Sequence, residues 1–194
     1  MNYLAHLYLS GKNNDVLIGN FIADSVKGSK HKDYPYDIQR GILLHRQIDT
    51  HTDVHPNFRT STKRLHKNYG HYSSVIVDIF FDHFLAKNWR DYAEIPLNDY
   101  VQKCYFILNK NIQMMPEKAQ YILPFMVKEN WLLSYASLEG ISAVLHGMNK
   151  RTQGRSGMDK ATEELQQFYS EFEDDFKLVF KDLKQMSQSF LEQR

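Results

Sequence analysis

The last third of the chain repeats apolar residues every three or four positions, and this spacing restricts the fold more than any other feature. The repeat consists of Leu165, Phe168, Phe172, Phe176, Val179, Leu183, Met186 and Phe190. Such spacing places side chains on one face of an α-helix, whereas a half-buried strand requires alternation at every second position. No run of β-branched residues alternates over the length of a strand. We therefore predict an all-α fold.

Helical spacing continues through the rest of the chain, with prolines near the expected helix starts and glycines near some ends. The predicted helices cover residues 2–10, 14–28, 35–53, 57–68, 72–91, 96–113, 117–134, 138–151 and 158–191. Residues 152–157 are the best candidate for a linker, although this length also suits a connection between two helices. For a chain of 194 residues we expect one domain that spans residues 1–194.

Composition limits the kind of metal site and the cellular compartment. The chain has one cysteine, Cys104, so a cysteine-rich zinc site is excluded and any metal must be bound by nitrogen and oxygen. No apolar run approaches the roughly 20 residues that span a bilayer, and the first residues do not follow the pattern of a signal peptide. We expect a cytoplasmic protein that has no membrane partner.

Two pairs of metal-competent side chains occur at helical spacing. His45 and Asp49 are four residues apart in LLHRQIDTHTDVHP, and Asp78 and Asp82 are four apart in VIVDIFFDHFLAKNW. Residues at i and i+4 share a helix face, with Cβ atoms about 5–6 Å apart. The second pair lies among apolar residues, and two buried carboxylates on one face require a cation. We expect both pairs to form the core of one metal site.

Two residues nearer the amino terminus are expected to complete or bridge this site. They are His6 in NYLAHLYLS and Asp24 in GNFIADSVKG, both in apolar surroundings. Taken singly, each is equally well explained as a buried histidine with a hydrogen-bond partner or as a helix-terminal acid. Mixed imidazole and carboxylate ligation suits zinc, manganese, iron or nickel. Such a metal lowers the pKa of a bound water and polarises a substrate oxygen, as phosphoester hydrolysis requires.

A basic flank follows the first pair. Between Val54 and Val77 the sequence has no acidic residue but contains Arg59, Lys63, Arg64 and Lys67. Charge runs are usually solvated surfaces, yet this one lies beside a candidate hydrolytic site and favours an anionic substrate. Nucleic acid is disfavoured because the net charge is only +1 and no nucleic-acid motif occurs. An acidic protein would fit the same surface.

These segments resemble a known family when they are taken in order. NYLAHLYLS, GNFIAD with VKG, GILLHRQID with TD and HP, DIFFDHFLAKNW, and WLLSYASLEGI with LHGM and a following arginine resemble the acyl carrier protein phosphodiesterase family over nearly the whole chain. The motif positions are His6, Asn20, Asp24, His45, Arg46, Asp49, Asp53, Asp78, Asp82 and His83.

The resemblance implies a helical bundle distantly similar to the HD-domain phosphohydrolases, which hold metals with histidine and aspartate. It implies hydrolysis of the phosphodiester that joins 4′-phosphopantetheine to a serine of holo acyl carrier protein, which releases the apo carrier. Manganese is the metal it implies, with magnesium, iron and zinc as alternatives. The strongly acidic carrier would be the partner of the basic flank. The order Asp82-His83 reverses the usual HD dyad, so ligand roles follow from spacing.

The working hypothesis assigns further roles within this reaction. His83 protonates the serine leaving group or binds the metal, Arg46 holds a non-bridging phosphate oxygen, and Asp24 takes part in catalysis as well as in metal binding. The carrier binds at Arg59, Lys63 and Arg64. The possible walls of a slot for the phosphopantetheine arm are Trp89, Trp131 and Tyr135.

Two other classes of function remain open. One is a metal-dependent phosphohydrolase that acts on a nucleotide or another small phosphodiester. The other is a helical metal-binding module without enzymatic activity. A ferritin-like carboxylate site is disfavoured, because such sites use glutamate and residues 1–93 contain none.

Overall fold

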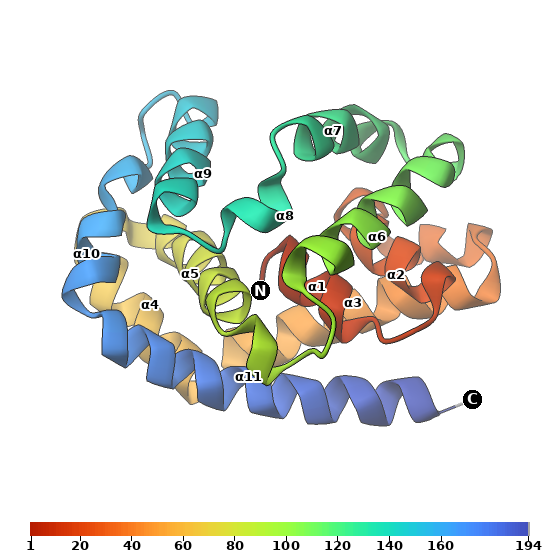
Figure 1. Ribbon diagram of the computed structural model, residues 1–194, viewed down its shortest axis with the longest axis horizontal. Helices are drawn as coiled ribbons and strands as arrows, with labels where there is room; N and C mark the ends of the chain where they lie inside the picture. Colours follow the sequence, from red (N-terminus) through yellow and green to blue (C-terminus); the bar gives the residue numbers. More distant parts are fainter. Residues whose placement is uncertain (194) are drawn as a thin grey trace.

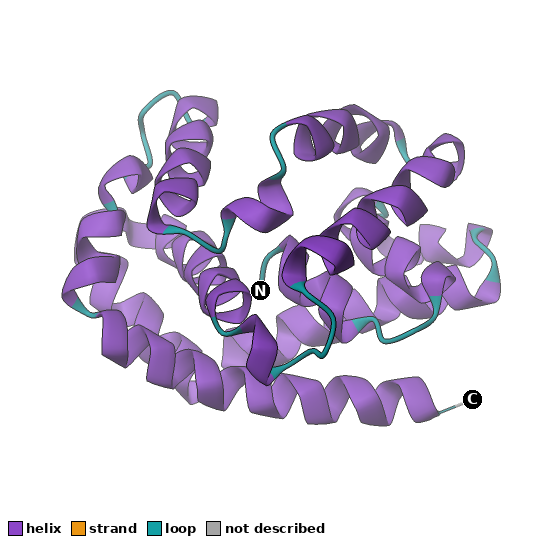
Figure 2. Ribbon diagram, in the orientation of Figure 1, coloured by secondary structure: helices purple, strands orange, loops and turns teal. Residues whose placement is uncertain are grey.

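The computed structural model describes residues 1–193, and within this range every regular element is a helix, which confirms the all-α prediction (Figure 2). The α-helices are α1 (Tyr3–Leu9), α2 (Asn14–Ile22), α3 (Tyr36–Val54), α4 (Pro56–Tyr69), α5 (Ser73–Lys87), α6 (Leu97–Lys110), α7 (Glu117–Lys128), α8 (Trp131–Ser134), α9 (Leu138–Arg151), α10 (Thr162–Gln167) and α11 (Tyr169–Glu192). The short 3-10 helices are η1 (Ala23–Ser25), η2 (Gly28–Asp33), η3 (Gly70–Tyr72), η4 (Trp89–Asp91), η5 (Ile112–Met114) and η6 (Met158–Lys160). No helix of the described residues is long and apolar enough to cross a membrane.

The longest helix, α11, runs along one edge of the molecule, and α6 to α9 form an arc at the opposite edge (Figure 1). The apolar stripe of α11 packs against α1, α3, α4 and α5. Phe172, Phe176 and Phe180 are fully buried in this contact. Each buried phenylalanine side chain contributes about 1.5–3 kcal/mol relative to an exposed one. The stripe predicted from the sequence is therefore a packing surface.

Helices α2 and α3 approach each other until their backbones touch. A Cβ atom on Gly19 would lie 2.1 Å from the carbonyl oxygen of Ile38, and one on Gly41 would lie 2.1 Å from the carbonyl oxygen of Val16. Only glycine fits at such distances, because backbone atoms cannot move aside as a flexible side chain can. The close approach brings Asn20, the residue after Gly19, against α3.

The predicted helices 14–28, 72–91 and 96–113 end early as α-helices, and the short 3-10 helices η1, η4 and η5 follow them. Two other predicted helices are each divided into two α-helices. The segment 117–134 becomes α7 and α8, because Asn130 adopts a left-handed conformation with φ 47°. The segment 158–191 becomes η6, α10 and α11, with a break at Phe168, where φ is −115° and ψ is 34°. The apolar period continues through both breaks, so periodicity alone predicts uninterrupted helices. The prediction for residues 138–151 is confirmed by α9.

Residues 152–157 connect two helices of the same core. The side chain of Asn149 accepts hydrogen bonds from the Ser156 hydroxyl and the Gly157 N–H, and its amide donates to Asp159. These bonds fold the segment back onto α9. Buried apolar residues on both sides of it, from Met1 to Leu183, belong to one cluster. The segment is therefore a helix connection, as its length allowed.

Candidate metal centre and cavity

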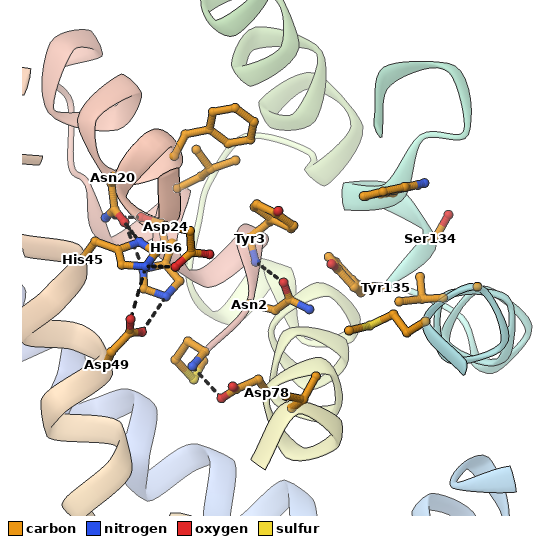
Figure 3. A pocket seen from close by; sticks show the side chains of 18 of the residues that line it. Asn2, Tyr3, His6, Asn20, Asp24, His45, Asp49, Asp78, Ser134 and Tyr135 are labelled. Atoms are coloured by element: carbon orange, nitrogen blue, oxygen red, sulfur yellow. Dashed lines mark hydrogen bonds and ion pairs between the residues drawn. The ribbon is translucent and has the colours of Figure 1, made fainter. Parts of the chain in front are cut away.

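Helices α1 and α3 bring His6, His45 and Asp49 together (Figure 3). The Nε2 atom of His6 lies 3.2 Å from Oδ1 of Asp49, and the Nε2 atom of His45 lies 3.2 Å from Oδ2 of the same carboxylate. One ligand atom from each residue lies within 4.8 Å of the others. Both histidines are buried, whereas Asp49 is partly exposed to the cavity. The three side chains can therefore bind one ion.

A buried asparagine of α2 fixes the tautomers of both histidines. The Oδ1 atom of Asn20 lies 2.9 Å from Nδ1 of His6 and 2.9 Å from Nδ1 of His45. The Nδ2 group of Asn20 donates to the His6 carbonyl and to the Ser10 hydroxyl, so Oδ1 is free to act only as an acceptor. Each Nδ1 therefore carries a proton and each Nε2 faces Asp49, so a ring that is neutral presents its lone pair from Nε2. This is the arrangement by which second partners orient metal-binding histidines.

The charges of the cluster favour one positive charge between the histidines. Asp24, exposed on η1, places Oδ1 3.3 Å from Nε2 of His45. Burial lowers the pKa of His45, but hydrogen bonds with Asp24 and Asp49 outweigh it and raise the pKa to about 9. Burial and the neighbouring His45 charge lower the pKa of His6 to about 4. A divalent cation fits this donor set because it would replace the proton and bind both Nε2 atoms beside the carboxylates.

The cluster lies at one side of a cavity of about 580 Å³. Residues of α8 and α9 form the opposite side, where Ser134 and Tyr135 lie across the cavity from the cluster (Figure 3). The guanidinium carbon of Arg151 lies 5.3 Å from the ring centroid of Trp131 on the same wall. Within residues 1–193 Arg151 forms no ion pair with a carboxylate. The cavity thus has a carboxylate-histidine side and a side with a free guanidinium.

Asp82 lies outside the metal-competent group, which corrects the expectation that it shares one core with His45 and Asp49. It is fully buried, and its two oxygens accept hydrogen bonds at the start of α1. The donors are the backbone N–H groups of Asn2, Leu4 and Ala5, at 3.2, 2.7 and 3.3 Å. Burial raises the pKa of Asp82 to about 7. The N-terminal amides of α1 therefore satisfy this carboxylate in place of a cation.

Asp78 has a partner other than the histidines. Its Oδ1 atom lies 2.6 Å from the amino group of Met1, with which it forms an ion pair. Asp78 lines the cavity together with Asp53, but neither belongs to the group whose ligand atoms converge. Asp78 and Asp82 are thus one turn apart on α5, as predicted. Both carboxylates, however, bind the amino-terminal segment: Asp78 through the Met1 amino group, and Asp82 through backbone N–H groups.

Arg46 holds the chain next to Asp24 instead of facing the cavity. Its Nη2 atom donates to the carbonyl oxygens of Val26 and Gly28, at 2.8 and 3.0 Å. These two residues follow η1, the element that carries Asp24. The expected contact between Arg46 and a phosphate oxygen is therefore replaced by a bracing role. Arg151 is the guanidinium that lines the cavity.

His83 also lies outside the cavity lining. Its Nδ1 atom donates to the Tyr135 carbonyl, at 2.7 Å, so in the neutral ring Nε2 accepts from the Tyr169 hydroxyl, at 2.7 Å. Burial lowers the pKa of His83. The expected roles in protonating the leaving group or binding a metal do not fit a ring whose nitrogens are both occupied.

The residues expected to bind substrate divide into those at the cavity and those elsewhere. Trp131 and Tyr135 line the cavity. Trp89 is buried away from it, and its Nε1 donates to the Ile95 carbonyl, at 2.8 Å. Of the three expected aromatic walls, two are therefore at the cavity.

The basic residues of α4 are only partly available to a partner. Arg64 forms an ion pair with the buried Asp175 of α11. The Nε atom of Arg59 donates to the Asp53 carbonyl, at 3.0 Å, while Lys63 is exposed. The basic flank therefore presents fewer free charges than its sequence suggests.

Two residues, Asn20 and Arg151, have positions in the site that the sequence does not predict. Asn20 belongs to the motif positions, but the motif does not predict its hydrogen bonds to both histidines. The one indication in the sequence is that a single amide lies inside the apolar run VLIGNFI. Arg151 is the last residue of α9 and lines the cavity. The sequence pattern does not predict this position, because the cavity is formed by segments far apart in the chain.

Comparisons with known proteins agree with one another. The sequence profile of the family described as acyl carrier protein phosphodiesterase matches residues 1–183. The acyl carrier protein phosphodiesterase of Photorhabdus laumondii is 32% identical over 174 residues, which cover 89% of this chain and 88% of the relative. That of Yersinia pestis is 30% identical over 189 residues, which cover 97% of this chain and 98% of the relative. No solved structure matches the chain.

Proposed function

The chain belongs to the acyl carrier protein phosphodiesterase family, and from this premise we propose that it hydrolyses the phosphodiester of holo acyl carrier protein, with 4′-phosphopantetheine and the apo carrier as products. The observation that carries the proposal is the convergence of two oriented imidazoles and a carboxylate at the side of the cavity. A cavity of about 580 Å³ falls within the range of small-molecule sites, roughly 300–1,000 Å³. It can accept the phosphopantetheine arm.

A divalent metal would be held by His6 and His45 through Nε2 and by the carboxylate of Asp49, with Asp24 beside them. We propose manganese, and the same nitrogen and oxygen donors also suit magnesium, iron or zinc. When bound, the metal supplies Lewis-acid chemistry, which lowers the pKa of a water ligand and polarises a phosphoryl oxygen. The protein contributes a fixed donor geometry, because Asn20 holds both rings in the tautomer that leaves Nε2 free.

The remaining steps fall to residues around the cavity. Asp24 is an exposed carboxylate beside His45, and it is placed to accept the proton of the attacking water. That proton then goes to the serine oxygen as its bond to phosphorus breaks, which completes the hydrolysis. Arg151 can donate through its planar fork to non-bridging phosphate oxygens and stabilise the charge that grows on them. Trp131 and Tyr135 form an apolar wall against which the phosphopantetheine arm can pack, and this wall reduces the access of bulk water to the cavity.

The experiment is a mass assay on the intact carrier. The purified protein is incubated with holo acyl carrier protein and Mn²⁺, and loss of the phosphopantetheine mass is followed by mass spectrometry. Wild type should convert the carrier to its apo form, Asp49→Asn should not, and Asp91→Asn, an exposed residue outside the cavity lining, serves as a control with the same change of side chain.

An inert wild type with manganese, magnesium, iron and zinc in turn would contradict the proposal. Cleavage of a small phosphodiester without cleavage of the carrier would instead identify another metal phosphohydrolase. Metal binding without either activity would identify a binding module.

A further inference from the structure

One face of α7 carries two exposed aromatic side chains between two lysines. These residues, Lys118, Tyr121, Phe125 and Lys128, are separated by three, four and three positions and form what we call the α7 stripe. Tyr121 is 71% exposed and Phe125 is 45% exposed. Their ring centroids are 5.3 Å apart. The aromatic pair is thus preassembled on the surface.

The opposite face of α7 explains why the stripe is free. Ala119, Leu123 and Met126 are buried and anchor the helix to the core. The stripe contributes nothing to that anchor, so its apolar area is not explained by folding. Within residues 1–193, neither lysine of the stripe forms an ion pair. Aromatic residues at the centre with charges at the rim are typical of protein interfaces.

The stripe leads directly to the cavity. The stripe ends at Lys128, the last residue of α7. The next residue, Glu129, lines the cavity, and so does Trp131 two positions further on. In the overall view α7 continues into α8, which borders the cavity (Figure 1). A protein bound on the stripe would therefore sit next to residues that line the same cavity as the metal-competent cluster.

We propose that the α7 stripe is the docking surface for the carrier protein, an inference that rests on the proposed function. The two unpaired lysines complement an acidic partner, and Tyr121 and Phe125 supply the desolvated centre that charges alone do not provide. The phosphopantetheine arm then enters the cavity past Trp131 while the carrier stays outside.

The basic flank on α4 is the competing surface, and it lacks an exposed apolar centre. Its large apolar side chains, Phe58, Leu65 and Tyr69, are buried. Its exposed cations without an ion pair among the described residues, Arg59, Lys63 and Lys67, can attract an acidic carrier over a distance and raise the association rate. The contact itself is assigned to α7.

The test compares two double variants of identical charge change. Phe125→Asp with Lys128→Glu alters the stripe, and Leu178→Asp with Lys181→Glu alters the same i and i+3 pattern on α11, where Leu178 is 51% exposed. The dissociation constant for holo acyl carrier protein is measured by calorimetry, with Mn²⁺ affinity and thermal unfolding as checks. The stripe variant should weaken carrier binding about tenfold or more, and the α11 variant should not.

If the stripe variant unfolds, Lys118→Gln with Lys128→Gln replaces it and should weaken binding more at low salt than at high salt. Carrier binding that is equal in all variants, or absent in wild type, would overturn the docking proposal. If wild type is a dimer, the stripe variant is a monomer, and carrier binding is the same in both, the docking proposal is overturned. The stripe is then an interface between two copies of the chain. Failure of hydrolysis with stripe-dependent binding intact would overturn the proposed function and leave the docking surface standing.

Discussion

The imidazole rings of His6 and His45 are stacked, with centroids 4.0 Å apart and planes inclined by 20°. Two adjacent imidazolium ions would repel, so the pair carries one positive charge: the pKa of His45 is raised to about 9, and that of His6 is lowered to about 4. Both Nδ1 atoms donate to Asn20, which leaves the two Nε2 atoms to share a cation with Asp49.

Asn20→Leu should lower metal affinity about 10- to 100-fold, the usual effect of removing a partner that orients a metal ligand. Leucine has a similar volume but offers no acceptor, so each imidazole can rotate or change tautomer. Mn²⁺ titration by calorimetry measures the loss. Ser10→Ala is the control, because it removes one partner of the Asn20 amide but leaves Oδ1 in place. Equal affinity in Asn20→Leu and wild type would show that the asparagine does not set the tautomers.

Metal affinity should rise with pH. The metal competes with the proton of His45, whose pKa is about 9 without metal. Between about pH 6.5 and 8.5 the apparent affinity should therefore rise about tenfold per pH unit, as expected when binding releases one proton. Calorimetry in buffers of different ionisation enthalpy also counts the released proton. An affinity that is independent of pH in this range would mean that no proton occupies the metal position.

Asp82→Ala should reduce stability but keep the metal site. Three backbone N–H groups at the start of α1 lose their acceptor, with an expected loss of about 3 kcal/mol in the free energy of unfolding. Chemical denaturation and metal analysis give the two readouts, and the exposed Asp91→Ala is the control. Normal stability with loss of bound metal would return Asp82 to the metal core.

Gly41→Ala should disrupt the site from a distance. Its new Cβ atom would lie 2.1 Å from the Val16 carbonyl oxygen, so α2 and α3 must separate. Overpacking of this kind destabilises by about 1–3 kcal/mol, and Asn20 moves away from His45. Gly147→Ala on α9 is the control, since no atom lies within 4 Å of its added Cβ. Unchanged stability and metal affinity in Gly41→Ala would mean that the close approach is dispensable.

Arg151→Met and Arg46→Met should affect different properties. Methionine at position 151 keeps an apolar stem against Trp131 but removes the free guanidinium, and turnover of the carrier should fall about 100-fold with little change in stability. At position 46 the same change releases the Val26 and Gly28 carbonyls and should lower the melting temperature first. Turnover measured with thermal unfolding separates the two. If Arg46→Met lowers turnover and Arg151→Met lowers the melting temperature, Arg46 is the residue that contacts the phosphate.

The sequence predicted the fold class, most helices and part of the site, and the limits have physical causes. The pair His45 and Asp49 could be predicted because both lie on one turn of one helix. Asp78 and Asp82 have the same spacing, but a buried carboxylate can be satisfied by helix amides or an amine as well as by a metal. That choice depends on where α1 begins relative to α5, a long-range relationship that spacing does not contain.

The central claim is that the Nε2 atoms of His6 and His45 bind one metal ion. The most direct measurement is pulsed electron paramagnetic resonance of the Mn²⁺-loaded protein, which detects the nuclei of coordinated nitrogen. Wild type and Asp82→Asn should show coupling to two histidine nitrogens, and His6→Ala and His45→Ala should each show one. Wild-type Mn²⁺ without nitrogen coupling, or coupling to two nitrogens that persists in either single variant, would contradict this claim.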